Sequence, residues 1–200
     1  MRGRAGLFGG TFNPLHNGHV VIAKNAMEQF GLSRVVFVPN GTPPNRREEP
    51  RPGKEDRFRM VAQAVEGEDR LSASRVEVDR EGPSYTIDTI RALKDDYPEG
   101  ICFIIGADCL VRIETWKEPE AVIASVPFIV APREGVSFSA FERAPFDEAS
   151  IYGLEMPEVD VSSTALRERA RRGESIAPWV PPQVAAYIEE HGLYGDAEEA

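Results

Sequence analysis

Three uninterrupted runs of apolar residues constrain the fold of this chain most strongly. They occupy residues 34–39, 101–105 and 127–131, with the sequences RVVFVP, ICFII and PFIVA. A strand that is apolar on both sides has to be covered on both faces, which is typical of a parallel sheet. Segments with helical spacing of apolar residues separate these runs. The alternation predicts an α/β fold, a doubly wound, mostly parallel sheet with helices on both faces.

The helical segments carry their apolar residues at the spacing that one buried face requires. Val20 and Met27 share a face of the first helix, and Phe58 and Val61 are expected to face the core from a later one. Further helices are predicted over residues 54–66, 85–97, 119–125, 163–172 and 182–191, and short strands over 5–8, within 71–78 and at 154–156.

Composition and length point to an ordinary globular protein. No long linker is visible, so residues 1–194 are expected to form one domain, with 195–200 as an acidic, solvated tail. Acidic residues outnumber basic ones by 33 to 23, and the net charge of −10 disfavours non-specific binding to nucleic acid or membranes.

No membrane-spanning run or signal-peptide core is visible, which leads us to expect a cytoplasmic location. Cys102 and Cys109 are expected to be buried thiols in a reducing compartment. The sequence leaves the oligomeric state open, including a homo-oligomer.

A glycine-rich loop, GGTFNPLHNGH over residues 9–19, connects the first strand to the first helix. Its glycines let backbone N–H groups approach a ligand, and the N-terminus of the following helix favours phosphate. His16 and His19 are three residues apart, so both can lie on one face of the first helical turn. Two imidazoles there can donate hydrogen bonds to phosphate oxygens.

Three other interpretations of this loop compete with a phosphate site. A zinc site needs three or four ligands, and no cysteine or acidic residue stands at ligand spacing. The dinucleotide fingerprint G-x-G-x-x-G is not supplied by Gly6, Gly9 and Gly10. A structural glycine turn with incidental histidines stays open, although two of the three histidines of the chain fall in this turn.

A second candidate segment is VSSTALR, residues 161–167. Ser162 and Ser163 are natural helix N-caps. Ser163 and Arg167 are four residues apart and share a helical face, which places a cation one turn above a helix N-terminus, as a triphosphate clamp requires. A capped surface helix with solvated arginines is the alternative.

Both segments resemble motifs of one superfamily. The loop resembles the G-x-F-x-P-x-H-x-G-H signature of nucleotidylyltransferases, and residues 161–167 resemble their I-S-S-T-x-I-R motif. Class I aminoacyl-tRNA synthetases share a shorter H-x-G-H end, but nothing here suggests an anticodon-binding appendage. Residues 38–44, 82–86 and 104–108, with Trp116 downstream, resemble segments of the bacterial nicotinate-nucleotide adenylyltransferases, enzymes of NAD biosynthesis.

The resemblance runs over residues 5–194. It implies a Rossmann-like nucleotidylyltransferase fold and the transfer of AMP from ATP to nicotinate mononucleotide, giving nicotinate adenine dinucleotide and pyrophosphate. The nucleophile would be a phosphate oxygen that is already ionised near pH 7, so no general base or covalent residue is needed. Mg²⁺ would arrive with ATP, held by phosphate and water, and no dedicated metal site is expected.

The resemblance also implies the roles of single residues. His19, His16 and Arg167 would act on the phosphates, with His19 the more critical. The residues expected to bind ATP are Gly9, Gly10, Thr11, Phe12, His16, Gly18, His19, Gly106, Asp108, Ser162, Ser163 and Arg167. The residues expected to bind the nicotinate nucleotide are Asn40, Arg46, Tyr85, Thr86 and Trp116.

The acceptor residues have physical interpretations of their own. Tyr85 and Thr86 begin a predicted helix, so their N–H groups are free to meet an anion such as a pyridine carboxylate. Trp116 can stack on a pyridine ring, and Asp108 can accept hydrogen bonds from ribose hydroxyls. A capped Gly-Pro turn, a core aromatic and a turn aspartate remain the respective alternatives.

The sequence departs from the family pattern at two positions. Asn13 stands where the family often has Asp, with little change expected, because the residue serves the turn. Asn45 stands where the family has His, while Arg46 keeps the positive charge. Residues 40–53, rich in proline and arginine, would suit a lid. Two other functions stay open: transfer to phosphopantetheine or nicotinamide mononucleotide, and a non-catalytic nucleotide-binding module.

Overall fold

The computed structural model describes residues 1–44, 51–142, 145–146, 149–157 and 161–195. Within these ranges a six-stranded sheet runs in the order β3-β2-β1-β4-β5-β6, and all neighbouring strands are parallel. The strands are β1 (Ala5–Gly10), β2 (Arg34–Pro39), β3 (Leu71–Ala73), β4 (Ile101–Gly106), β5 (Phe128–Ala131) and β6 (Ile151–Gly153). The predicted doubly wound parallel sheet is therefore confirmed.

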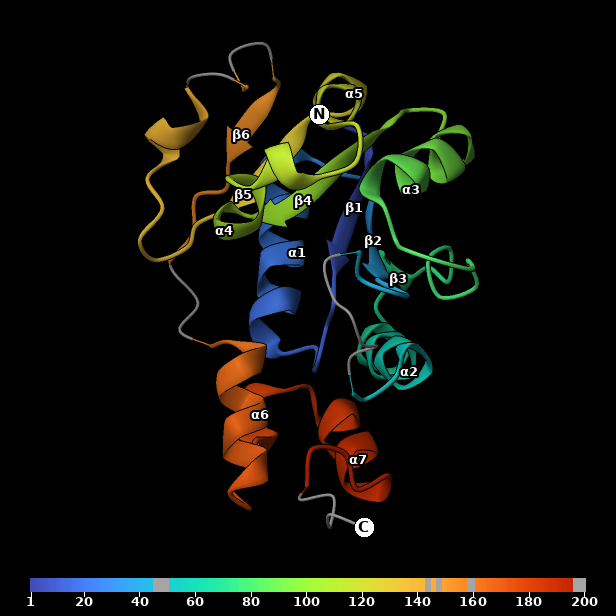
Figure 1. Ribbon diagram of the computed structural model, residues 1–200, viewed down its shortest axis with the longest axis vertical. Helices are drawn as coiled ribbons and strands as arrows, with labels where there is room; N and C mark the ends of the chain where they lie inside the picture. Colours follow the sequence, from blue (N-terminus) through green and yellow to red (C-terminus); the bar gives the residue numbers. More distant parts are fainter. Residues whose placement is uncertain (45–50, 143–144, 147–148, 158–160, 196–200) are drawn as a thin grey trace.

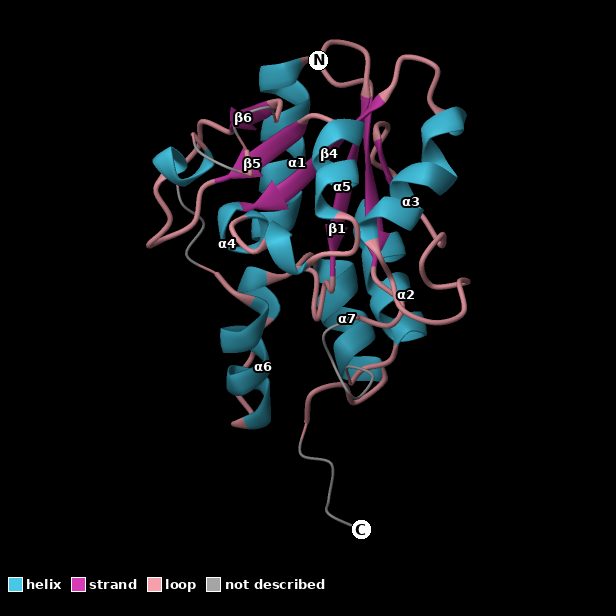
Figure 2. Ribbon diagram, turned by 45° about the horizontal axis from the view of Figure 1, so that its top comes forward, coloured by secondary structure: helices cyan, strands magenta, loops and turns pink. Residues whose placement is uncertain are grey.

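Helices cover both faces of this sheet (Figures 1 and 2). The α-helices are α1 (Asn17–Phe30), α2 (Lys54–Val65), α3 (Thr86–Leu93), α4 (Ala107–Leu110), α5 (Pro119–Ser125), α6 (Ser163–Arg171) and α7 (Pro182–Glu190). Short 3₁₀ helices are η1 (Lys94–Asp96), η2 (Ile113–Thr115), η3 (Phe138–Phe141) and η4 (Ala177–Trp179). Helices α6 and α7 lie at the end of the molecule toward which β1 points (Figure 1).

Two apolar cores explain why the central strands are apolar without interruption. Phe8 of β1 packs into a core with α1, α2, α6 and α7, whereas the preceding Leu7 packs into a core with α3, α4 and α5. Phe37 and Val38 of β2 divide between the two cores in the same way. Alternate side chains of a strand point to opposite faces, so both sets are buried.

Local signals in the sequence set several helix ends. Helix α1 ends at Gly31, whose φ of 63° lies in the left-handed region that glycine adopts without strain. Helix α5 begins with Pro119 in its first turn. The Ser162 side chain accepts a hydrogen bond from the N–H of Ala165, which confirms the predicted cap of α6.

Other expectations about the fold are wrong. The last strand is Ile151–Gly153 rather than 154–156, because this edge strand is only partly buried and has no apolar signature, while Leu154 is buried just beyond it. Phe58 is only half-buried, whereas the preceding Arg57 is fully buried and Val61 is buried as expected. Cys102 is buried as expected, but Cys109 is exposed.

Candidate active site

A pocket of about 310 Å³ opens where the carboxyl ends of β1, β4 and β5 meet the N-terminal ends of α1 and α6. Strand β1 is flanked by β2 and β4, so the strand order reverses here, and ligands of open α/β sheets bind at such points. The residues expected to bind ATP all line this pocket except Gly18, which is buried in the first turn of α1.

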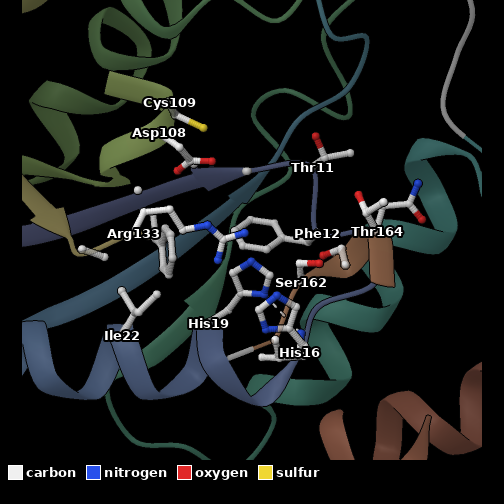
Figure 3. Close-up of a pocket in the computed structure, with 18 of the residues that line it drawn as sticks. Thr11, Phe12, His16, His19, Ile22, Asp108, Cys109, Arg133, Ser162 and Thr164 are labelled. Atoms are coloured by element: carbon white, nitrogen blue, oxygen red, sulfur yellow. Dashed lines mark hydrogen bonds between the residues drawn. The ribbon is translucent and has the colours of Figure 1, made fainter. Parts of the chain in front are cut away.

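The two histidines of the glycine-rich loop stack on each other inside this pocket, with ring centroids 3.7 Å apart (Figure 3). His16 is 6% exposed, and the rings of Phe8 and Phe12 pack edge-on against His19. The backbone N–H of His16 donates to Nδ1 of His19 at 3.2 Å. The two rings are thus held in one place by the fold itself.

Burial keeps both imidazoles neutral at pH 7. It lowers the pKa of His16 to about 4, with the charge of Arg133 as a second cause. Burial, His16 and Arg133 together hold the pKa of His19 well below its usual value. Because Nδ1 of the neutral His19 accepts a hydrogen bond, its proton sits on Nε2. The pair therefore offers neutral N–H donors, and Arg133 faces them across the pocket (Figure 3).

The low pKa of His16 makes a prediction about stability. The unfolded chain binds a proton on His16 near pH 6.5, but the folded chain does so only near pH 4. Between these values the unfolded state holds more protons, so stability falls as the pH falls. We expect the difference in unfolding free energy between wild type and His16→Asn to shrink by about 3 kcal/mol from pH 7 to pH 4. Urea unfolding of both proteins at pH 7 and pH 4 measures this difference in unfolding free energy. A difference that does not change with pH would contradict the prediction.

Helix α6 is docked on the glycine-rich loop. The hydroxyl of Ser163 donates to the carbonyl oxygen of Pro14 at 3.0 Å. The guanidinium of Arg167 donates to the carbonyl oxygen of Asn13 at 2.8 Å and to the hydroxyl of Thr164 at 3.1 Å. Arg167 also lines the pocket, so the alternative of a surface helix with a solvated arginine is wrong for this residue.

Asn13 joins three distant parts of the chain. Its Oδ1 accepts a hydrogen bond from the hydroxyl of Tyr194 at 2.6 Å, and its Nδ2 donates to the carbonyl oxygen of Arg51 at 3.2 Å. Its backbone carbonyl receives Arg167. A carboxylate at position 13 could not donate to Arg51, so asparagine does more here than form the turn.

The described residues expected to bind the acceptor, Asn40, Tyr85, Thr86 and Trp116, lie on a second group of loops, outside this pocket. Tyr85 caps α3 and Thr86 is its first residue. Thr42 of the loop after β2 pairs with Pro83, and the N–H of Ser84 donates to the carbonyl of Thr42 at 2.8 Å. The fold therefore brings the segments 40–44 and 83–86 side by side. Arg46 and Asn45 lie outside the described residues, as do residues 45–50 of the expected lid.

The side chain of Asn40 links two loops by hydrogen bonds. Its Nδ2 donates to the hydroxyl of Thr11 at 3.1 Å, and its Oδ1 accepts from Arg57 at 2.8 Å. Its side chain thus ties the loop after β2 to the glycine-rich loop.

Trp116 is half-buried and packs against the core that contains α3. The two residues after it are ion-paired to α3, Lys117 to Asp88 at 3.0 Å and Glu118 to Arg91 at 2.6 Å. The Lys117 ammonium also lies 4.8 Å from the centroid of the Tyr85 ring. Trp116 therefore combines a core contact with partial exposure, next to residues that are ion-paired to α3.

The sequence interpretation missed two cationic residues. Arg133 lines the pocket, and its place two residues after the apolar run 127–131 was a usable signal, because that run ends at the same edge of the sheet. Arg57 lies inside a helix, where an arginine is expected to face solvent, and the sequence contains no signal for its burial.

The described residues hold no group of three or more histidine, cysteine or acidic side chains that could bind a metal ion. Asp108 is the one carboxylate among the described residues that line the pocket. In the same part of the chain, no helix has the length and apolar character to cross a membrane.

Comparison with known proteins places this site in a family. Residues 7–169 match the family model described as cytidylyltransferase-like. A protein of Rubrobacter xylanophilus named "Probable nicotinate-nucleotide adenylyltransferase" is 39% identical over 198 residues, covering 96% of this chain and 92% of that protein. A protein of Thermus thermophilus with the same name is 41% identical, covering 96% of this chain and 99% of that protein.

A solved structure has the same fold. The Plasmodium falciparum nicotinic acid mononucleotide adenylyltransferase, complexed with NaAD, matches with a TM-score of 0.78 at 17% identity, over 96% of this chain and 98% of that one. At this low identity the likeness establishes the fold, and the identity to the bacterial relatives establishes the family. The chain belongs to the cytidylyltransferase-like family and, within it, to the nicotinate-nucleotide adenylyltransferases.

Proposed function

We propose that this protein transfers the adenylyl group of ATP to the 5′-phosphate of nicotinate mononucleotide, giving nicotinate adenine dinucleotide and pyrophosphate. One observation carries the proposal: the pocket that holds His16 and His19 is hydrogen-bonded, through Thr11 and Asn40, to the loop after β2, which pairs with the segment that begins α3. The family and the relatives named for this activity support it.

The pocket suits the triphosphate of ATP. It presents neutral imidazole donors from His16 and His19, the cations of Arg133 and Arg167, and the glycine backbone at Gly9 and Gly10. Phosphoryl and nucleotidyl transfer depend on alignment and on stabilisation of charge at the transferred phosphorus. The Nε2–H of His19 would donate to the α-phosphate oxygens, while Arg167 and the hydroxyls at the start of α6 would hold the leaving pyrophosphate.

The acceptor needs no activation by a base. Its phosphate has a second pKa of about 6 and carries nucleophilic oxygen at pH 7. The described residues contain no hydrogen bond from the N–H of Tyr85, Thr86 or Ile87, as expected of a helix start. These donors would receive the pyridine carboxylate, Trp116 would stack on the ring, and Arg46 would meet the acceptor phosphate.

Mg²⁺ is the metal we propose, bound mainly to the phosphates of ATP, where it would neutralise their charge. Asp108 is the pocket carboxylate that could contact its water shell or the ribose of ATP.

We further propose that residues 1–194 act as one domain with 195–200 as a tail, that a homo-oligomer is compatible with the fold, and that a role in NAD biosynthesis implies a cytoplasmic location.

The test is pyrophosphate release from ATP and Mg²⁺ with one acceptor at a time. Nicotinate mononucleotide, nicotinamide mononucleotide and phosphopantetheine would each be offered to the full chain. A strong preference for the first supports the proposal. Release only with another acceptor would keep the phosphate pocket and refute the pyridine site. Binding of ATP without release in any arm would favour a non-catalytic nucleotide-binding module.

Loss of the Trp116 ring is expected to affect one substrate. In Trp116→Ala the KM for nicotinate mononucleotide should rise about tenfold, because stacking of a base on an aromatic ring is worth about 1–3 kcal/mol, while the KM for ATP stays within about twofold. Trp116→Phe keeps a ring and should recover most of the affinity. Initial rates over both substrates measure this, and equal changes in the two KM values would mean that Trp116 is only a core residue.

A further inference from the structure

A buried arginine clamps together the loops of the two substrate subsites. Arg57 of α2 is 0% exposed. Its guanidinium donates to the carbonyl oxygen of Thr11 at 3.0 Å, to the carbonyl and side-chain oxygens of Asn40 at 2.7 and 2.8 Å, and to the carbonyl of Gly41 at 2.9 Å. Thr11 belongs to the glycine-rich loop of the phosphate pocket, and Asn40 and Gly41 belong to the loop on the acceptor side.

A second group of contacts continues from Gly41 to the start of α3. The N–H of Gly41 donates to the hydroxyl oxygen of Ser84 at 2.9 Å. The buried carboxyl of Glu77 accepts a hydrogen bond from Thr89 at 2.6 Å and is also hydrogen-bonded to Ser84. One connected path therefore runs from Thr11 through Arg57, Gly41 and Ser84 to Glu77.

This path is tightly packed at its centre. A Cβ atom at Gly41 would collide with the backbone carbonyl oxygen of Glu77, so only glycine lets the two segments approach this closely. Burial raises the pKa of Glu77, whereas the hydrogen bonds from Thr89 and Ser84 and the charges of Arg80 and Arg57 lower it. Burying a guanidinium and a carboxyl costs free energy unless each is well satisfied. Both are buried here at the junction of two subsites rather than in the centre of a core.

We propose that Arg57 and Glu77 are positioning residues that fix the distance between the phosphate pocket and the acceptor subsite. This inference rests on the proposed function, in which both substrates must be held in line for the transfer. Arg57 sets the separation of Thr11 from Asn40 and Gly41, and Glu77 anchors the start of α3 to Gly41 through Ser84. Neither side chain touches a reacting atom.

A spacing role leaves a distinctive signature. Each substrate alone contacts one side of the junction, so its own affinity should not depend on the spacing. The dinucleotide product spans both sides, and so does the transition state. A misplacement of about 1 Å can cost about 10²-fold in rate without loss of ground-state binding. Loss of spacing should therefore lower kcat and weaken product binding while sparing the separate substrates.

The experiment compares Arg57→Lys with wild type and with Arg59→Lys. Arg59 is an exposed residue on the same helix and provides the matched control. A lysine ammonium has three donors in a compact group and cannot reproduce the planar fork that meets four acceptors. We expect kcat to fall about 10²-fold and nicotinate adenine dinucleotide to bind about tenfold more weakly. The Kd values of ATP alone and of nicotinate mononucleotide alone should change less than about threefold.

Ser84→Ala is the second variant, and it tests the inference even if Arg57→Lys does not fold. It removes the single hydroxyl between Gly41 and Glu77. It should give the same pattern with smaller effects. Calorimetric titration of each ligand, steady-state rates and melting temperatures supply the readouts.

Two outcomes would overturn the spacing inference while leaving the proposed function intact. In the first, the wild-type enzyme makes the dinucleotide, and Arg57→Lys or Ser84→Ala keeps the wild-type kcat and product affinity. The other is a variant in which ATP alone loses as much affinity as the product, because Arg57 would then only support the phosphate pocket. A wild type that makes no dinucleotide would instead refute the proposed function, and the inference with it.

Discussion

Replacement of His19 by alanine is expected to lower turnover by about 10²-fold or more, the scale of losing one preorganised donor to a developing oxyanion. The imidazole is neutral, and its Nδ1 is fixed by the backbone N–H of His16, so its Nε2–H is ready before substrate binds. No reorientation is needed during the reaction. The loss should appear in kcat more than in the KM for ATP, because the donor acts most strongly in the transition state.

His191→Ala is the matched control for this experiment. His191 is the third histidine of the chain, exposed at the end of α7 and outside the pocket. Its replacement should leave kcat near the wild-type value. The melting temperature of His19→Ala should stay close to that of wild type, since the Phe8 and Phe12 rings remain in place. A near-normal kcat in a folded His19→Ala protein would remove His19 from the mechanism.

Replacement of Arg167 by alanine is expected to reduce kcat/KM for ATP about 10- to 100-fold. A hydrogen bond to a charged group contributes about 1.5–3 kcal/mol, and each 1.4 kcal/mol corresponds to a factor of ten. The guanidinium of Arg167 already contacts Asn13 and Thr164, and in this position it would bind the phosphates of ATP. Arg167→Lys should recover only part of the activity, because a point charge does not replace the planar fork.

Arg171→Ala controls for the general loss of positive charge on α6. Arg171 lies one turn further along this helix and is exposed. Its replacement should change kcat/KM by less than about twofold. Initial rates over a range of ATP concentrations, at fixed acceptor, distinguish the two variants. Equal effects of Arg167→Ala and Arg171→Ala would mean that Arg167 contributes only long-range charge.

The parts of the fold that follow from local patterns were predictable. Residues 35–38 are apolar on both sides because both cores use them, and this continuous run marks a buried parallel strand. The glycine-rich loop and the Ser162 cap are likewise local, since each depends on a few neighbouring residues. The placement of both at the same pocket then follows from the parallel topology.

The parts that depend on contacts between distant loops were not predictable. Arg57 reads as a solvated helix residue, but backbone carbonyls of Thr11, Asn40 and Gly41 satisfy it inside the protein. Periodicity therefore placed Phe58 in the core instead. The strand at 151–153 has no pattern of its own because it is a short, partly exposed edge.

The sequence also predicted residues of both subsites, but not how the two subsites are connected in space. It predicted that Tyr85 and Thr86 start a helix, and they do. It gave no sign that Asn40 would be hydrogen-bonded to both Thr11 and Arg57, because these contacts join two separate loops to helix α2. The assignment of each residue to ATP or to the acceptor remains a prediction for the mutants above.

The hydrogen bond from Tyr194 to Asn13 has a consequence for how the protein is made. A ribosome delivers the glycine-rich loop well before the residues that brace it, because Arg167 and Tyr194 lie 154 and 181 residues after Asn13. A nascent chain can pair strands β1 and β2 early, yet its phosphate pocket stays incomplete until Arg167 and Tyr194 have emerged. Premature termination upstream of residue 160 should thus yield fragments without activity, rather than partly active enzyme that would consume ATP.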